Sequence, residues 1–168
     1  MAKNEHPSLD NQKLNCLNMQ FPFALDITFP GDLEYIPAIR KFVAEILQVS
    51  SFSPRFAYRS EIIVDEICNN AVVYGCHSEN AEISLSSRVG SDNIEFIIKD
   101  QGGTRENITR LKKAVTTDAA EKDESINQEG LGLEIVRMLS ERMDVVIDEN
   151  NLTSVHIVRK REDERNKI

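Results

Sequence analysis

The chain has 168 residues, of which 40% are apolar and 29% charged, and its formal net charge is −8. This length suggests one domain of an ordinary soluble globular protein. The negative charge argues against general nucleic-acid binding, which needs clustered Lys and Arg, and against attraction to anionic lipid. Acidity of this size commonly serves solubility alone, and a basic protein partner is the sharper alternative.

The cysteines and the N-terminus bear on where the protein works. The chain has three cysteines, Cys16, Cys68 and Cys76. An odd number of widely spaced cysteines argues against a secreted fold held together by disulfide bonds. Cys76-His77 has no second pair at zinc-binding spacing, so we expect no metal site of Cys and His. The chain shows neither a basic-then-apolar signal segment nor the ~20 apolar residues of a membrane span. We therefore expect a cytoplasmic protein.

The apolar pattern predicts the elements in chain order. After a flexible tail we expect a strand, two helices, two strands, a long polar region, a helix and two strands. The predicted bounds are 1–20 for the tail, then 21–29, 32–48, 54–73, 81–88, 93–99, 104–129, 130–142, 143–148 and 153–159. Asp32 is suited to cap the first helix, and Gly75 follows the second as a helix stop would. This order predicts an α+β fold, a two-layer sandwich in which helices cover one face of a mixed, mostly antiparallel sheet.

The polar region 104–129 differs from its surroundings because it is charged and low in aromatic residues. Three apolar residues at helical spacing predict a short helix within it: Ile108, Leu111 and Val115. The stretch 121–129 has the composition of a mobile loop, and a long polar loop inside a compact domain is usually functional or disordered. The predicted divisions are an N-terminal tail, a domain and a charged C-terminal tail, at 1–20, 21–160 and 161–168.

Four polar residues interrupt the apolar second half of the 54–73 helix: Asp65, Glu66, Asn69 and Asn70. Residues four apart lie on nearly the same side of a helix, so Asp65 pairs with Asn69 and Glu66 with Asn70. Burying such groups without partners is costly, so at least one pair should face a ligand or solvent. An Asn oxygen could bind magnesium, and a carboxylate one turn away could accept a proton from a hydroxyl. Spacing does not choose between the pairs, and a solvated stripe is the plain alternative.

Two further segments combine with this helix. Asp100 ends a strand and is followed by Gly102 and Gly103. Such a carboxylate can accept a hydrogen bond from an exocyclic amine such as that of adenine, and the glycines let the backbone pass close to a flat ring. The alternative is an Asx turn. Each segment alone favours its structural explanation, whereas the segments together indicate a nucleotide site.

The third segment is Gly130-Leu131-Gly132, which opens the last predicted helix. Glycines at a helix start expose unpaired backbone N–H groups at the positive end of the helix dipole, which suits phosphate. No Gly-Lys-Ser/Thr follows, and no parallel strand–turn–helix unit surrounds the segment. It is therefore neither a Walker motif nor a Rossmann fingerprint.

In this order the three segments resemble the Bergerat-type ATP-binding fold shared by gyrase, histidine kinases and mismatch-repair ATPases. Over residues 22–160 the chain more narrowly resembles the anti-sigma factor serine/threonine kinases. Their helix motif, Glu-x-x-x-Asn-Ala, reads Glu66-Ile67-Cys68-Asn69-Asn70-Ala71 here. The resemblance implies that Glu66 is the catalytic base and Asn70 the magnesium ligand. It thereby settles the choice that spacing left open.

The resemblance assigns further residues. It implies that Asp100 reads the adenine amine, that 104–129 is a lid over the nucleotide, and that Arg105 or Arg110 in this lid could stabilise the transferred phosphoryl group. The nucleotide-binding residues that it implies are Asn70, Asp100, Gly102, Arg105, Gly130, Leu131, Gly132, Leu133 and Thr153.

Three positions differ from the family pattern. The family's Asp-x-Gly-x-Gly has Thr104 at its last position here, with Gly103 one residue early. Leu152 stands where a glycine often precedes the late threonine, and Tyr74 stands where a histidine usually follows Asn-Ala. The base and the magnesium ligand are unaffected by these differences.

The family implies an ATP- and magnesium-dependent protein kinase that phosphorylates a serine or threonine of a STAS-type anti-anti-sigma protein. It also implies an anti-sigma factor that withholds a sigma factor from RNA polymerase, and a homodimer for which the 32–48 helix offers exposed surface. The main alternative is a regulatory module that binds ATP without kinase activity.

Two other nucleotide-dependent classes fit less well. A detached histidine-kinase catalytic domain would need a phosphorylatable His on a dimerising helix, and none of His6, His77 and His156 lies on an apolar heptad. A gyrase-like ATPase would need an additional transducer domain, for which the chain is too short.

Overall fold

A computed structural model describes residues 21–116 and 131–161. Its elements in chain order are β1 (Phe23–Pro30), the 3-10 turn η2 (Leu33–Tyr35), α2 (Ile36–Val49), α3 (Pro54–Gly75), β2 (Glu82–Val89), β3 (Asn93–Asp100), α4 (Arg105–Thr116), α5 (Leu131–Leu139), β4 (Arg142–Ile147) and β5 (Thr153–Lys160). The tail predicted at 1–20 lies outside the described residues, as do all but the first residue of the tail predicted at 161–168 and the stretch 117–129 of the predicted lid.

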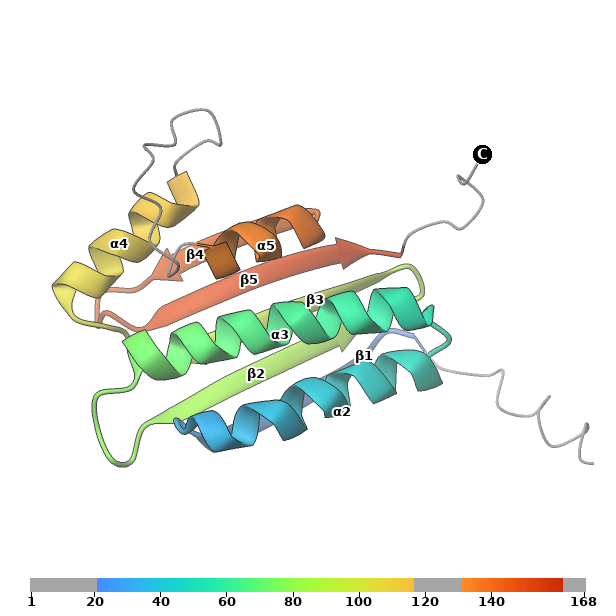
Figure 1. Cartoon of the computed structure of the whole chain (residues 1–168), viewed down its shortest axis with the longest axis horizontal. Coiled ribbons are helices and arrows are strands. Elements are labelled where there is room, and N and C mark those ends of the chain that lie inside the picture. Colours follow the sequence, from blue (N-terminus) through green and yellow to red (C-terminus); the bar gives the residue numbers. More distant parts are fainter. Residues whose placement is uncertain (1–20, 117–130, 162–168) are drawn as a thin grey trace, which may run out of the picture.

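The five strands form one sheet in the order β1–β2–β3–β5–β4. Every strand pair in the described part of the chain is antiparallel, so the mixed element of the prediction is not needed. Helices α2, α3 and α5 lie side by side over one face of this sheet, and α4 lies beyond its end (Figure 1). The expected α+β two-layer sandwich is confirmed.

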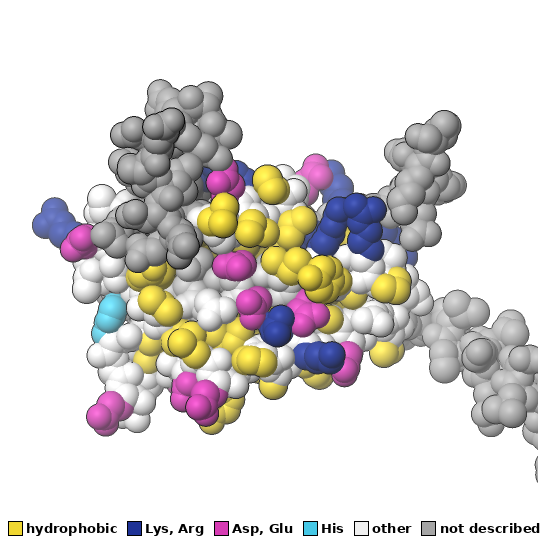
Figure 2. Space-filling view, viewed as in Figure 1, with side chains coloured by type: hydrophobic (Ala, Val, Ile, Leu, Met, Phe, Trp, Pro, Cys, Tyr) yellow, Lys and Arg dark blue, Asp and Glu magenta, His cyan; other side chains and the backbone are white. Residues whose placement is uncertain are grey.

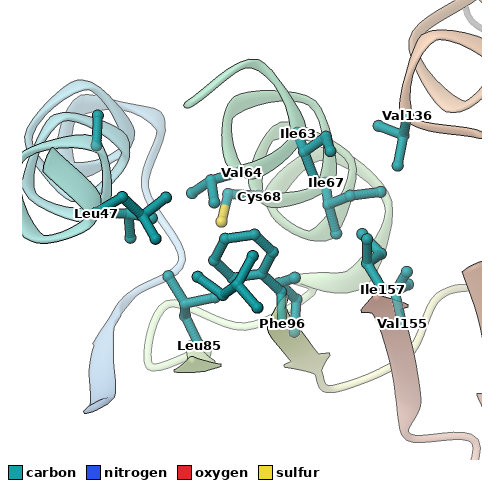
Figure 3. Close-up of a cluster of buried hydrophobic side chains, with 14 of the residues drawn as sticks. Leu47, Ile63, Val64, Ile67, Cys68, Leu85, Phe96, Val136, Val155 and Ile157 are labelled. Carbon is teal, nitrogen blue, oxygen red and sulfur yellow. The ribbon is translucent and has the colours of Figure 1, made fainter. Parts of the chain in front are cut away.

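The core fills the space between the two layers. Ile63 of α3 points toward Val136 of α5, Val64 points toward Leu47 of α2, and Cys68 points toward the sheet that carries Phe96 (Figure 3). All of these side chains are at most 1% exposed. Burial of this kind stabilises a fold at ~25 cal/mol per Å² of apolar surface removed from water. The long helix α3 is therefore the central element of the upper layer, as its nearly all-round apolar pattern predicted.

One buried charge was not foreseen from the sequence. The inward positions of β5 alternate, and the last of them is Arg159, which is 2% exposed. Its guanidinium donates to the backbone oxygens of Leu139 and Phe56 and to Ser60 Oγ, and it stacks on the Phe56 ring. A buried cation is tolerated when its donors are satisfied. Arg159 thus ties the end of β5 to α3 and α5.

The two outer surfaces of the sandwich differ in polarity. The face of the sheet that no helix covers carries polar and charged side chains, among them Asp26, Ser84, Ser86, Arg88, Glu95, Lys99, His156 and Lys160. Most of the exposed large hydrophobic side chains lie instead on the helix layer: Leu33, Tyr35, Phe42, Val49, Tyr58, Val73, Leu131 and Met138. Figure 2 shows these apolar groups around scattered carboxylates on the helix side. Exposed apolar surface of this kind marks the helix layer as the side that suits a protein contact.

The predicted element bounds need three small corrections. Asp32 does cap a helical turn, because its Oδ1 accepts from Glu34 N at 3.0 Å, but the turn is the short η2 rather than the α-helix itself. Gly75 is the last residue of α3 and does not follow it. Helix α5 ends at Leu139, three residues early, because β4 begins at Arg142 to pair with Val158.

Candidate active site

The two polar pairs of helix α3, Asp65 with Asn69 and Glu66 with Asn70, lie on different sides of the helix. The helix begins with Ser53, whose hydroxyl accepts from Phe56 N, followed by Pro54 in the first turn. Asp65 turns toward α2, where Arg40 Nε lies 3.2 Å from Asp65 Oδ1. Asn69 donates its Nδ2 to the backbone oxygen of Asp65 at 2.7 Å. The Asp65–Asn69 pair therefore has structural partners within the helix layer.

Glu66 and Asn70 form the other pair, on the side of α3 against which α5 packs. Gly132, in the first turn of α5, lies so close that an added Cβ would overlap Glu66 Oε2. The pKa of Glu66 is raised, first by burial and then by the negative charge of Asp65. Asn70 Nδ2 is buried and has no hydrogen-bond partner among the described residues. This side of α3 thus brings a carboxylate with raised proton affinity and an unpartnered amide up to the start of α5.

Asp100 and Thr153 lie opposite each other across β3 and β5. Asp100 Oδ1 accepts from the backbone N–H of Gly102 at 2.7 Å, and the Thr153 side chain also hydrogen-bonds to this carboxylate. Burial raises the pKa of Asp100, and the hydrogen bonds from Gly102 and Thr153 and the nearby His77 offset part of that rise. The result is a fixed carboxylate that still has acceptor capacity for a ligand.

Two glycines allow the backbone to close around Asp100. Gly102 has a φ of +78°, and a Cβ there would overlap the backbone oxygen of Asn151 in the β4–β5 turn. A Cβ on Gly75 would overlap the Asp100 carboxyl group itself. The end of α3 and the end of β3 can therefore meet only because position 75 lacks a side chain.

The altered glycine segment has a structural explanation. Thr104 Oγ1 accepts from Asn107 N at 3.2 Å, which makes Thr104 the N-terminal cap of α4. Asn107 also donates its Nδ2 to the backbone oxygen of Tyr74 at 3.4 Å, and a Cβ on Gly103 would lie only 2.5 Å from that same oxygen. The start of α4, where the predicted lid begins, is thus anchored to the end of α3.

The other predicted site residues lie in different places. Arg105 is exposed at the start of α4 and lines a pocket of about 310 Å³ with Gly103, Ile108, Thr109 and Asn151. Neither Glu66 nor Asp100 lines that pocket, so the structure does not bring Arg105 to the proposed base. Gly130 lies outside the described residues, as does the Arg110 side chain.

The remaining two predicted residues belong to the first turn of α5. Leu131 is exposed, whereas Leu133 is buried and belongs to the core cluster. Leu133 therefore anchors the helix, and only its backbone could serve a ligand.

Sequence reasoning missed Gly75 and Asn107 as parts of the site. Gly75 was interpreted as a helix stop, and its contact with Asp100 depends on how α3 lies over β3. Asn107 stands three residues after Thr104, a capping spacing that could have been recognised. The link to Tyr74 spans 33 residues and has no local signal.

A family model, described as the histidine kinase-like ATPase domain, matches residues 29–159. The chain belongs to this family. The matched range includes α3, β3, α5 and β5, so it contains every element of the candidate site. The resemblance stated from the sequence is confirmed.

Curated relatives narrow the similarity. The chain is 25% identical over 126 residues to a serine-protein kinase RsbW of Bacillus licheniformis, a match that covers 74% of this chain and 78% of the relative. It is 22% identical over 125 residues to a serine-protein kinase RsbW of Bacillus cereus, with the same coverage. Both relatives are named as serine-protein kinases.

A solved structure supports the fold independently. A chain in the crystal structure of the SiaB–SiaC complex from Pseudomonas aeruginosa superimposes with a TM-score of 0.64 at 17% identity. The match covers 90% of this chain and 99% of that one. The similarity concerns the fold alone, and it extends over nearly the whole chain.

The residues fit the ATP and magnesium that this family implies. An Asn carbonyl oxygen is a ligand type that Mg²⁺ accepts alongside water and phosphate oxygens. Asn70 is half-buried, and its buried Nδ2 has no hydrogen-bond partner in the described structure, so no contact of that nitrogen fixes the amide away from a ligand. Asp100 could accept from the adenine amine, and the first turn of α5 could donate backbone N–H groups to phosphate. No described helix is long and apolar enough to cross a membrane.

Proposed function

We propose that this protein is an ATP-dependent serine/threonine protein kinase and an anti-sigma factor. Its proposed substrate is a STAS-type anti-anti-sigma protein, and its proposed second partner is a sigma factor. The observation that carries the proposal is the close approach of the Glu66 carboxylate to Gly132 at the start of α5. It brings the candidate base next to the candidate phosphate cradle.

Each site residue then has a proposed role. Asn70 would hold Mg²⁺, which neutralises phosphate charge when bound. The backbone N–H groups of Gly130, Leu131, Gly132 and Leu133 would donate to the phosphates. Glu66 would accept the proton from the attacking hydroxyl of the substrate protein. Its raised pKa suits this role, because a base with greater proton affinity drives the transfer further.

Adenine recognition is assigned to the other end of the site. Asp100, with Gly102 and Thr153 fixing its carboxylate, would accept from the exocyclic amine. Arg105, exposed at the start of α4, would reach the phosphates only if the lid moved. We therefore assign Arg105 the weakest part in binding.

The exposed apolar side chains of the helix layer support a protein partner on that side. Tyr58, Leu131 and Met138 are all more than half exposed on α3 and α5, the helices that carry Glu66 and Gly132. A substrate protein docked there would bring its hydroxyl to the base. We also propose that the protein is cytoplasmic and has no nucleic-acid or membrane partner, because its net charge of −8 disfavours binding to phosphate backbones and to anionic lipid.

We also propose a homodimer formed through α2. Tyr35 directly before α2 and Phe42 and Val49 on it recur every seven residues and are 46%, 41% and 72% exposed. Sedimentation of the wild type and of Phe42→Glu would test this, with a dimer expected for the first and a monomer for the second. A monomeric wild type would refute it.

The alternative is an ATP-binding regulatory module without kinase activity. The observation that favours it is the anchored start of α4, where Thr104 and Asn107 replace the family's second glycine with a cap and a link to Tyr74. A lid fixed in this way could hold nucleotide without passing a phosphoryl group on.

Phosphoryl transfer from labelled ATP distinguishes the two functions. We would incubate the full chain with γ-labelled ATP, Mg²⁺ and purified STAS-domain proteins from the same organism. Label on a serine or threonine, lost when that residue is changed to alanine, supports the kinase. ATP binding without any transfer supports the regulatory module.

A further inference from the structure

Arg40 on α2 contacts two carboxylates of α3. Its Nη1 lies 3.2 Å from Glu61 Oε1 and its Nε lies 3.2 Å from Asp65 Oδ1. The Nε is buried and lacks hydrogen-bond geometry, so the second contact is an ion pair alone. Figure 2 shows a basic side chain among acidic ones on this helix side. Helices α2 and α3 are thus joined by one cation between two anions.

Asp65 is the immediate neighbour of Glu66. Successive residues on a helix point about 100° apart, so Asp65 faces α2 while Glu66 faces α5. The two carboxylates nevertheless remain close enough for the charge of Asp65 to raise the pKa of Glu66. A cation held against Asp65 can therefore influence Glu66 through the charge of Asp65, without touching Glu66.

We propose that Arg40 is a positioning residue for Glu66: it holds the Asp65 carboxylate toward α2 and offsets its charge beside the base. This inference rests on the proposed function, in which Glu66 is the base. Without Arg40, the Asp65 side chain would be free to turn toward Glu66, and its charge would be uncompensated.

The other charged groups around α3 define the background. Besides Glu66, helix α3 itself carries Arg55, Arg59, Glu61 and Asp65, and α2 carries Arg40, Lys41 and Glu45. Helix α5 carries Glu134 in its first turn and Arg137 in its last. Asp100 lies at the far end, beside Gly75. Of these groups, Arg40 lies 3.2 Å from the carboxylate of Asp65, the neighbour of the proposed base.

Solvent limits the size of the effect. The side chains of Arg40 and Asp65 are 37% and 34% exposed, so water and salt screen their interaction. We expect the loss of Arg40 to move the protonation midpoint of Glu66 upward by about 0.3–0.6 pH unit. The change should shrink in high salt.

The test is the titration of Glu66 in the full chain, followed by carbon-13 NMR of its carboxyl group without nucleotide or metal. Glu66→Gln assigns the signal. In Arg40→Gln the midpoint should rise, and in Asp65→Asn it should fall. The double variant should follow Asp65→Asn, because Arg40 has nothing to offset once Asp65 is neutral. Arg40→Lys should restore a midpoint near that of the wild type.

Arg88→Gln is the matched control, since it removes an exposed cation from the uncovered face of the sheet. It should leave the midpoint unchanged. The proposal is wrong if Arg40→Gln also leaves the protonation midpoint of Glu66 unchanged. It is also wrong if the double variant has the midpoint of Arg40→Gln. In either case Arg40 only joins α2 to α3. Thermal melting of each variant shows whether it is folded. If Arg40→Gln is unfolded, Asp65→Asn still measures the effect of the Asp65 charge on Glu66.

Failure of the proposed function would look different. A Glu66→Gln chain that transfers phosphate normally would remove the role of Glu66 as base while leaving the NMR coupling in place. Loss of the coupling with an inactive Glu66→Gln would refute the role of Arg40 and keep the kinase.

Discussion

The two ends of the candidate site are built differently. At the adenine end, Asp100 and Thr153 are paired across neighbouring strands, and Gly102 N–H fixes the carboxylate. At the phosphate end, Glu66 and Asn70 project from one helix toward another, and the Asn70 Nδ2 has no partner in the described residues. A sheet fixes side chains through its hydrogen-bonded ladder, whereas two packed helices can shift slightly. We therefore expect Asp100 to govern nucleotide affinity and Glu66 to govern the transfer rate, while Asn70 sets how far Mg²⁺ strengthens binding.

The largest expected effect comes from Glu66→Gln. The change keeps the shape of the side chain and removes its ability to accept a proton. Phosphoryl transfer should fall by about 10²–10⁴, as for the loss of a general base. The Kd for Mg-ATP should change by no more than about threefold, because Glu66 accepts the proton of the substrate hydroxyl only in the transition state of transfer. A variant that transfers at the wild-type rate would exclude Glu66 as the base.

Asp100→Asn should have the opposite profile. Loss of a charge-assisted hydrogen bond costs ~1.5–3 kcal/mol, so ATP should bind roughly 10- to 100-fold more weakly. Transfer at saturating ATP should change much less. The control is Asp144→Asn, since Asp144 is paired with Arg142 on β4 rather than at the site. If calorimetry shows equal affinity for Asp100→Asn and the control, the adenine end is misassigned.

Gly75 and Gly132 allow the same substitution to be compared at the adenine end and at the phosphate end of the site. An alanine at Gly75 would press on Asp100 near its backbone, where little can yield, whereas an alanine at Gly132 would press on the flexible end of Glu66. Gly75→Ala should therefore cost ~1–3 kcal/mol of stability and lower ATP affinity. Gly132→Ala should lower the transfer rate and cost less stability. Chemical denaturation with a transfer assay would measure both, and identical profiles would contradict the division into two ends.

How far the sequence predicts this site depends on the range of the interaction. The local motifs led to Glu66, Asn70 and Asp100, because helical spacing and strand ends are local patterns. Helical spacing left the choice between the two α3 pairs open, and the family resemblance selected Glu66 and Asn70. The contact of Asp65 with Arg40 on another helix has no local signal in the sequence. The contact of Gly75 with Asp100 likewise depends on tertiary packing.

Other features were predictable but missed. The alternation of β5 places Arg159 at an inward position two residues after Ile157, although its charge suggests exposure. Thr104 as a helix cap also follows from a local pattern. Arg159 was missed because a charged residue is usually exposed. Thr104 was missed because it was compared only with the glycine of the family pattern.

The smallest expected effects are those of pH. Glu66 must be deprotonated to act, and its pKa is raised above the ordinary value of 4.5. The transfer rate should therefore rise with pH and level off above this raised pKa. A rate that is already maximal below 4.5 would contradict the raised value.

At the adenine end, the free energy of unfolding should change with pH in the opposite direction to the transfer rate, because the contribution of Asp100 falls as pH rises. Asp100 also has a raised pKa, so the folded state holds its proton more tightly than the unfolded state. Its contribution is present below the unfolded carboxyl value of ~3.9 and is lost as pH rises through the folded pKa. Asp100→Asn should flatten this part of the stability profile, as measured by denaturation across the acidic range. An unchanged profile would exclude Asp100 as its source.

The most direct test of the whole site is calorimetry of nucleotide binding by the wild type, Asn70→Ala and Asp100→Ala, each with and without Mg²⁺. The wild type should bind ATP more tightly with Mg²⁺ than without it. Asn70→Ala should lose that difference while keeping metal-free binding, and Asp100→Ala should weaken binding under both conditions. Unchanged binding in both variants would contradict the ATP site at its centre.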